Sequence, residues 1–284
     1  MGSTRYDMDA RFDRARRAGY GSKSASEIFT QNAKRMAHES MNPRGIVFRE
    51  SRDSAVHPNT VPIVLGLDVT GSMGHIPHDL IKEGLPKLMG GIIQGGVPDP
   101  ALLFLGIGDH ECDHYPLQVG QFESGDEELD MWLTRTYIES GGGGNAGESY
   151  LLAWYFAAFH TRTDAFEKRN QKGLLFTVGD EPCLKTLPAS SIREIMGAGQ
   201  QTFTHRELLE EAKKRYEVFH INVLHSGQAM NADKGWKDLL GQNCLSITDY
   251  RDVPYVIKDV VCNRCKEDTS RSIDFRGFNH IQRF

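Results

Sequence analysis

The feature that most constrains this chain is a series of short, continuous apolar runs separated by segments with helical spacing of apolar residues. The runs lack the two-residue alternation of a strand with one wet face, and they cover 61–67, 101–107, 173–179 and 218–224. Continuous apolar strands are typical of a parallel sheet that helices cover on both faces. We therefore predict an α/β fold with a doubly wound, mostly parallel sheet sandwiched by helices, similar to a Rossmann fold.

Helical spacing fills the intervals between these strands. Thr204 and Glu207 form the pattern of a capping box, which predicts where one of these helices begins. A shorter strand is predicted at 244–247, and 116–122 alternates like an edge strand. The predicted helices cover 76–93, 127–138, 148–159, 204–216, 236–240 and 253–265.

The 284 residues suffice for one large domain, and the strand–helix pattern assigns it to 61–265. Residues 1–60 form a polar N-terminal extension with eleven basic and seven acidic residues, expected either to pack as an arm or to be disordered. Within it, 25–41 has the pattern of a short amphipathic helix. Residues 266–284 are expected to be a C-terminal tail that folds back and buries its phenylalanines.

Composition excludes several classes of protein. The net charge of −5 gives no overall attraction for nucleic acid. No apolar run approaches the roughly 18 to 20 residues that span a bilayer, and charged residues stand where a signal peptide needs apolar ones. Five cysteines, an odd number, suit a reducing compartment. We expect a cytoplasmic protein that binds neither membrane nor nucleic acid.

Oxygen-bearing side chains gather after the first predicted strand. Asp68, Thr70 and Ser72 place one carboxylate and two hydroxyls at alternate positions directly before a helix. Oxygen ligands suit hard cations such as Mg²⁺, which takes six of them in near-octahedral geometry. Asp180 follows the strand at 173–179, and parallel strands end at a common edge where ligands bind. The four residues are therefore candidate ligands of one ion.

Through Asp68-x-Thr70-x-Ser72 and Asp180, the chain resembles the von Willebrand factor A domain family and its metal-ion-dependent adhesion site. The family pattern is Asp-x-Ser-x-Ser after the first strand, a Thr in a middle loop and an Asp after the fourth strand. Here Thr70 replaces the first Ser and keeps the hydroxyl, and Asp180 lies one step later than the family's Asp. The resemblance, which covers 61–265, is to intracellular members from bacteria or phages.

The middle loop departs from the family pattern, because residues 140–149 contain no Thr. Asn145 or Glu148 is an equally good candidate for the missing ligand, and Ser149 is a weaker one. Asp109, His110 and His114 follow the second strand and belong at the same edge. They are expected to orient the ligands, to contact a partner or to form a solvated polar loop.

The resemblance implies a metal-dependent protein-binding module that holds Mg²⁺ or Mn²⁺ and captures a carboxylate of a partner protein. The implied partner is an ATPase or an assembly component. No complete catalytic constellation is present, so the chain is not expected to be an enzyme. Two alternatives stay open: a hydrolase or phosphotransferase that uses the same metal with His110 or His114 as base, and a structural or assembly protein whose metal site is empty.

Two further motifs carry little weight. Residues 142–149 imitate the spacing of a phosphate-binding loop, but Glu148 stands where that loop has Lys and would repel phosphate. Cys262 and Cys265 form a single C-x-x-C, whereas a structural zinc site needs four ligands. Both cysteines are expected to be free thiols on a helix rather than metal ligands.

Overall fold

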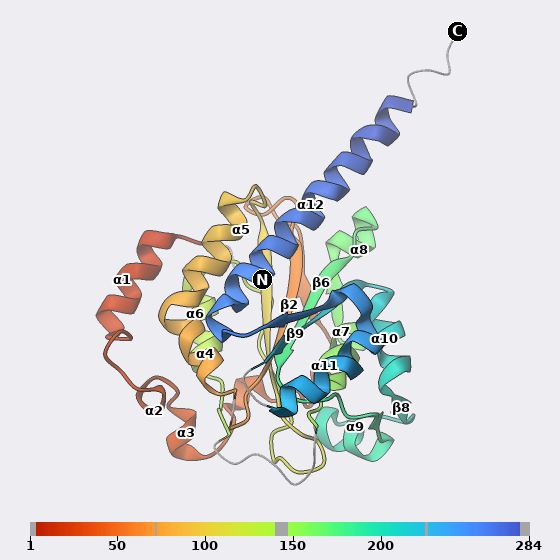
Figure 1. Ribbon diagram of the computed structural model, residues 1–284. Coiled ribbons are helices and arrows are strands. Elements are labelled where there is room, and N and C mark those ends of the chain that lie inside the picture. Colours follow the sequence, from red (N-terminus) through yellow and green to blue (C-terminus); the bar gives the residue numbers. More distant parts are fainter. Residues whose placement is uncertain (1–3, 72, 140–146, 225–226, 279–284) are drawn as a thin grey trace.

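The computed structural model describes residues 4–71, 73–139, 147–224 and 227–278, with residues 227–228 and 268–278 described by their backbone alone. Within these ranges, six strands form one central sheet (Figure 1). In spatial order they are β10 (Cys244–Ile247), β9 (Tyr216–Val223), β6 (Gly173–Gly179), β2 (Val61–Asp68), β3 (Pro100–Ile107) and β4 (Leu117–Val119). All neighbours are parallel except β4, which runs antiparallel to β3 at the edge. The predicted doubly wound, mostly parallel sheet is confirmed.

Helices bury both faces of this sheet, which is why its strands are continuously apolar. Successive residues of β2 point to opposite cores, with Ile63 and Leu65 in one and Val64 in the other. The first core is completed by α4 (His75–Asp79), α5 (Gly91–Gln94), α6 (Asp126–Thr134) and α12 (Val253–Phe278). The second is completed by α7 (Leu151–Phe159), α9 (Ala189–Met196), α10 (His205–Lys213) and α11 (Gly227–Leu240).

Several helices differ from their predicted bounds. The stretch predicted as one helix at 76–93 contains two π-helical segments, Leu80–Gly84 and Pro86–Gly90, between α4 and α5. Proline lacks the N–H that a regular helix would use, so the hydrogen bonding changes at Pro86. The capping box of Thr204 and Glu207 is present at the start of α10, as predicted.

The last helix, α12, continues well beyond Cys265, where the sequence pattern predicts its end. It runs to Phe278, and its second half extends away from the sheet (Figure 1). The backbone to Phe278 therefore does not turn back on the domain, and the burial of the tail's phenylalanines lies outside the described side chains. Among the described residues, no helix has both the length and the apolar content that crossing a bilayer requires.

Described residues of the N-terminal extension pack against the domain. They form α1 (Met8–Ala18), α2 (Ala25–Ile28), α3 (Gln31–Lys34), a 3₁₀ turn (Glu39–Met41) and β1 (Arg49–Ser51), which pairs with β5 (Thr161–Thr163). The single amphipathic helix predicted at 25–41 is thus divided into three short pieces. Phe29 and Met41 are fully buried in the first core. The remaining small elements are α8 (Asp164–Arg169), the β7–β8 pair (Thr186–Leu187 and Phe203–Thr204) and two 3₁₀ turns (Gly241–Asn243 and Tyr250–Asp252).

A buried ion pair attaches the arm to the domain. Arg11 of α1 is fully buried and lies 3.2 Å from the carboxylate of Asp130 on α6. Its guanidinium also donates to the main-chain oxygen of Ile81, and the hydroxyl of Tyr20 donates to Asp130 at 2.7 Å. Removing one partner of such a pair leaves the other charge buried without compensation, which is strongly destabilising.

Arg11→Met should therefore lower the free energy of unfolding by about 3 to 5 kcal/mol, because Asp130 loses its buried cation. Urea denaturation measures the loss, and limited trypsin digestion reports release of the arm. Arg16→Met is the matched control, since Arg16 is 79% exposed and its ion pair with Asp13 contributes at most about 1 kcal/mol. Equal stability of the two variants would contradict the role of Arg11.

Candidate metal site

Three buried carboxylic acids lie at the carboxyl ends of the two central strands. Asp68 is the last residue of β2, and Asp180 follows β6. Leu67 pairs with Val178 across these parallel strands, which brings Asp68 and Asp180 to neighbouring positions. The side chain of Glu148, just before α7, lies close enough to Asp68 for their charges to interact. The three residues are only 1%, 4% and 5% exposed.

Asp68 is held by hydrogen bonds from two sides. Its Oδ1 accepts from the backbone N–H of Thr70 at 2.9 Å and from the Thr70 hydroxyl at 2.7 Å. Its Oδ2 accepts from the Tyr150 hydroxyl at 3.1 Å. The strand-to-turn transition thus places the hydroxyl of Thr70 beside the carboxylate, as the Asp-x-Thr spacing predicts.

Glu148 is positioned by a short parallel bridge to the segment that follows β6. Its N–H donates to the oxygen of Pro182 at 2.9 Å, and its own oxygen accepts from Leu184 at 3.0 Å. Gly147 has φ +154°, and a side chain there would approach the Pro182 oxygen to 3.0 Å. Oε2 of Glu148 is buried and has no hydrogen-bond partner among the described residues. A buried, unpartnered carboxyl oxygen is costly unless something compensates it.

The three acids repel one another in their ionised forms. Burial raises the pKa of Asp68, and the neighbouring Asp180 charge raises it further, against the hydrogen bonds from Thr70. Burial likewise raises the pKa of Glu148, with the charge of Asp68 as the next cause. Both shifts show that the folded protein resists a full set of negative charges here.

A second ring of acids surrounds this group. Burial raises the pKa of Asp113, Glu139 and Glu181, and in each case an acidic neighbour adds to the effect. Asp113 and Asp109 in turn raise the pKa of Glu148. This edge of the sheet is therefore strongly electronegative, and a cation bound there would relieve the repulsion.

Sequence analysis did not identify Tyr150 as part of the site. Tyr150 is fully buried at the start of α7, and burial raises the pKa of its hydroxyl, so it stays a hydrogen-bond donor to Asp68. Its hydroxyl crosses the end of β6 at Gly179, where an added Cβ would lie only 1.8 Å away. Only glycine at 179 allows this contact. A buried Tyr at a helix start gives no distinctive sequence signal.

The loop after β3 is tied to the start of α7. The backbone N–H of His110 donates to the Ser149 hydroxyl at 2.8 Å, and His110 Nδ1 lies 2.7 Å from the same oxygen. Asp109 is 4% exposed, and its Oδ1 accepts from the N–H of Glu111. Of the three possibilities for this loop, the contacts favour a positioning role over a solvated polar loop. Ser149 faces His110, which leaves Glu148 as the described candidate for the middle-loop ligand.

Four of the six predicted metal ligands lie in the described residues, and the structure groups them. Asp68, Thr70, Glu148 and Asp180 gather at the ends of β2 and β6, whereas Ser72 and Asn145 lie outside the described residues. In the described part of the chain, no three His, Cys, Asp or Glu side chains are arranged to ligate one ion directly. An adhesion-type site relies on two carboxylates with hydroxyls and water, which is a smaller demand.

The donor set fits a hard divalent cation. Carboxylate and hydroxyl oxygens are the ligands that Mg²⁺ and Mn²⁺ prefer, and thiols and imidazoles are absent from the four grouped residues. The unpartnered Oε2 of Glu148 and the repulsion felt by Asp68 are the two signs of a missing positive charge. All five cysteines are free, and Cys262 is buried in the first core, as expected for a thiol with no ligand role.

Solved structures with a similar chain course include three of note. They are the pilus adhesin SpaC from Lactobacillus rhamnosus GG in its open conformation (11% identity, TM-score 0.48, 75% of this chain and 30% of that one), proximal thread matrix protein 1 from the mussel byssus (10%, 0.49, 72% and 48%) and a von Willebrand factor type A protein from Catenulispora acidiphila (12%, 0.40, 72% and 42%). The chain thus spans less than half the length of each. No protein-family profile and no curated protein sequence matches it.

Tyr150→Phe should destabilise the protein more at pH 8 than at pH 5. The hydroxyl of Tyr150 lowers the pKa of Asp68 by stabilising its ionised form, so the lost bond matters most where Asp68 is charged. A hydrogen bond to a charged group contributes about 1.5 to 3 kcal/mol, against about 1 kcal/mol for a neutral pair. Urea denaturation at the two pH values, in chelator, measures the difference.

Tyr216→Phe is the control for this experiment. Tyr216 is equally buried, but its hydroxyl pairs at 2.7 Å with the neutral hydroxyl of Thr161. Its loss should change stability by the same amount at both pH values. If Tyr150→Phe showed the same pH-independent loss, the hydroxyl would not be stabilising the charge of Asp68.

Glu148→Gln should flatten the dependence of stability on pH when metal is absent. A raised pKa means that the folded protein keeps a proton which the unfolded chain releases above about pH 4, so stability falls as the pH rises. Gln carries no such proton, and the fall should lessen by up to about 1.4 kcal/mol per pH unit. Urea denaturation from pH 5.5 to 8 measures the slope. The exposed Glu210→Gln should leave it unchanged, and an unchanged slope for Glu148→Gln would contradict the assignment.

Proposed function

We propose that this protein is a metal-dependent protein-binding module. It holds Mg²⁺ or Mn²⁺ at the carboxyl ends of β2 and β6 and binds an acidic side chain of a partner protein there. The main support is the burial of Asp68, Glu148 and Asp180 together at one edge of the sheet, where no described cation balances them. The adhesion-site spacing of Asp68, Thr70 and Ser72 supports the same proposal from the sequence.

In this proposal each residue has a separate role. Asp68 and Asp180 supply the negative charge, and Thr70 and Ser72 supply hydroxyl oxygens. Glu148 or Asn145 completes the protein ligands from the middle loop. When bound, the ion offers one further coordination position, which takes a carboxylate oxygen from the partner. Tyr150 and the N–H of Thr70 fix the orientation of Asp68 before the ion arrives, which lowers the cost of ordering the site.

The protonation of Glu148 decides whether the site accepts an acidic partner. Asp68 and Asp180 together balance a divalent charge, and Glu148 in its protonated form adds no further negative charge. A neutral Glu148 therefore reduces repulsion of the incoming carboxylate. If Glu148 ionised as well, the three acids would outweigh the ion and weaken capture of the partner.

The contacts favour binding over catalysis. A hydrolase using the same ion needs a base that reaches a substrate, and His110 directs Nδ1 to the fully buried Ser149. Burial also lowers the pKa of His110. We accordingly propose a binding protein that is not an enzyme, acting in the cytoplasm beside an ATPase or an assembly component, as the family resemblance implies.

Mn²⁺ provides the direct test, because water on the bound ion accelerates proton relaxation of the solvent. The wild-type protein should bind Mn²⁺ and enhance this relaxation, and Mg²⁺ should compete. Adding Nα-acetyl-aspartate methylamide should reduce the enhancement by displacing water, whereas the asparagine analogue should not. Mg²⁺ at a hundred times its Kd should also stabilise the fold by about 2.7 kcal/mol.

Asp68→Asn and Asp180→Asn should each abolish the metal-dependent stabilisation and the relaxation enhancement. Either variant removes a buried charge and can change stability by itself, so the comparison is between metal and chelator within each variant. Asp238→Asn, an exposed acid on α11, is the control. Wild-type protein that binds neither ion would refute the proposal, and binding that aspartate does not alter would refute the capture of an acidic partner.

A further inference from the structure

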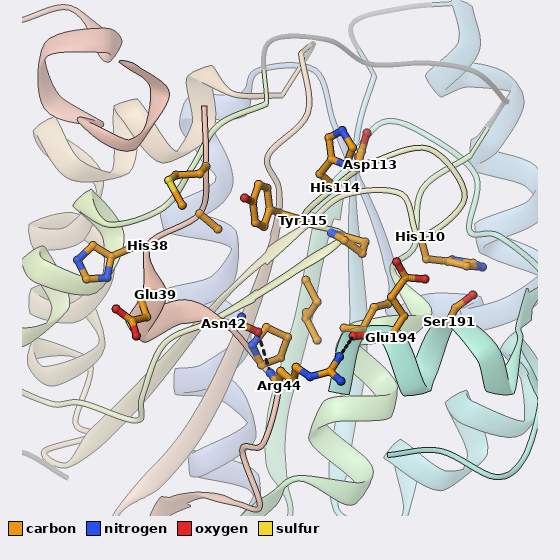
Figure 2. A pocket seen from close by; sticks show the side chains of 16 residues that line it. His38, Glu39, Asn42, Arg44, His110, Asp113, His114, Tyr115, Ser191 and Glu194 are labelled. Carbon is orange, nitrogen blue, oxygen red and sulfur yellow. Dashed lines mark hydrogen bonds between the residues drawn. The ribbon is translucent and has the colours of Figure 1, made fainter. Parts of the chain in front are cut away.

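A cavity of about 470 Å³ lies beside the candidate metal site (Figure 2). Its walls come from three parts of the chain: residues 36–44 of the N-terminal arm, residues 110–117 after β3, and α9. Figure 2 shows Glu39 on the arm side, Glu194 on α9 and Asp113 on the loop. The N-terminal extension therefore forms a binding surface together with the domain.

The cavity and the metal site share one loop. Asp113 lines the cavity, and its charge also raises the pKa of Glu148. His110 lines the same cavity and is bonded to Ser149, the residue next to Glu148. A partner segment that reaches the metal site with one side chain is thus well placed to reach the cavity with another.

The charged groups of the cavity are unbalanced. Three carboxylates line it, those of Glu39, Asp113 and Glu194, and none forms an ion pair with a described residue. Arg44 is the one Lys or Arg among the described lining residues, and its guanidinium donates to the main-chain oxygen of Glu194 rather than to a carboxylate. Burial lowers the pKa of both His38 and His110, so neither supplies a stable positive charge at neutral pH. The cavity lacks about one to two positive charges.

Apolar groups cover much of the remaining wall. They include Met36, which is 48% exposed at this surface, and the partly or fully buried Pro43, Pro116, Leu117 and Ile195. Lysine and arginine combine an aliphatic stem with a charged head, and they bury the stem against apolar surface while the head meets polar groups. The mixture of apolar wall and unbalanced carboxylates is complementary to such a side chain. The rings of Tyr115 and His114 add surfaces on which a guanidinium stacks.

We propose that this cavity, bounded by the arm, the β3 loop and α9, binds an arginine or lysine side chain of the same partner protein whose acidic side chain reaches the metal site. The identity of the partner rests on the proposed function, whereas the cationic specificity of the cavity does not. The partner is therefore a protein segment with a basic and an acidic residue close together. The arm contributes Glu39 and so takes part in choosing the partner.

The first experiment tests the cavity alone, with Nα-acetyl-arginine methylamide as probe and the neutral citrulline analogue as its matched control. NMR chemical-shift titration of the full chain should show the arginine probe binding at least tenfold more tightly than citrulline. The shifts should map to His110, His114 and Tyr115. Because the probe carries no acid, binding should be the same in Mg²⁺ and in chelator, and failure of the metal site leaves this result readable.

Glu39→Gln/Glu194→Gln should reduce arginine binding to the level of citrulline. Both residues are exposed, so the double variant is expected to fold, and an unchanged melting temperature checks this. Glu210→Gln/Asp238→Asn removes the same charge from α10 and α11 and should keep wild-type binding. Equal binding of arginine and citrulline, or unchanged binding by the Glu39/Glu194 variant, would overturn the proposal.

The second experiment tests whether one partner uses both sites. Peptides with Asp and Arg separated by one to four glycines are titrated in Mg²⁺. At least one spacing should bind tenfold more tightly than either single-residue probe, and Asp68→Asn should remove this gain while keeping the binding of the arginine probe. If no spacing shows a gain, the cavity and the metal site do not serve a common segment, and that part of the proposal is wrong.

Discussion

Like charges buried side by side repel strongly, because little water is left to screen them. At the carboxyl ends of β2 and β6 this repulsion acts among Asp68, Glu148 and Asp180, and it raises the pKa of the first two. A folded protein normally avoids such a group, since each buried charge needs a partner. Its presence at the edge where parallel sheets bind their ligands is what gives the rest of the structure a functional meaning.

The surrounding structure holds this costly arrangement in place rather than relieving it. Tyr150 reaches Asp68 across Gly179, and any other residue at 179 would block that approach. The bridge from Glu148 to the segment after β6 and the bond from His110 to Ser149 fix the middle loop from two sides. None of these contacts neutralises an acid. They orient oxygen atoms, which is what a preorganised cation site requires.

Much of the fold and part of the site followed from sequence pattern. The continuous apolar runs predicted β2, β3, β6 and β9 because both faces of these strands are buried, and the position of Asp68 and Asp180 at strand ends then followed from topology. Tyr150 could not be found in this way, since its role depends on α7 crossing the end of β6. The π-helical segments around Pro86 and the length of α12 also depend on tertiary packing that local periodicity does not encode. The packing of the arm rests on one buried pair, Arg11 with Asp130, far apart in sequence.

The central claim is that Asp68 and Asp180 ligate one divalent cation at the sheet edge. Crystals of the full chain grown with Mn²⁺ and measured on either side of the manganese absorption edge test it most directly. The account predicts a single anomalous peak between the carboxylates of Asp68 and Asp180, about 2.0 to 2.3 Å from the nearest oxygen atoms. No peak there, with the two carboxyl groups instead sharing a proton or bonded to a protein cation, would contradict it.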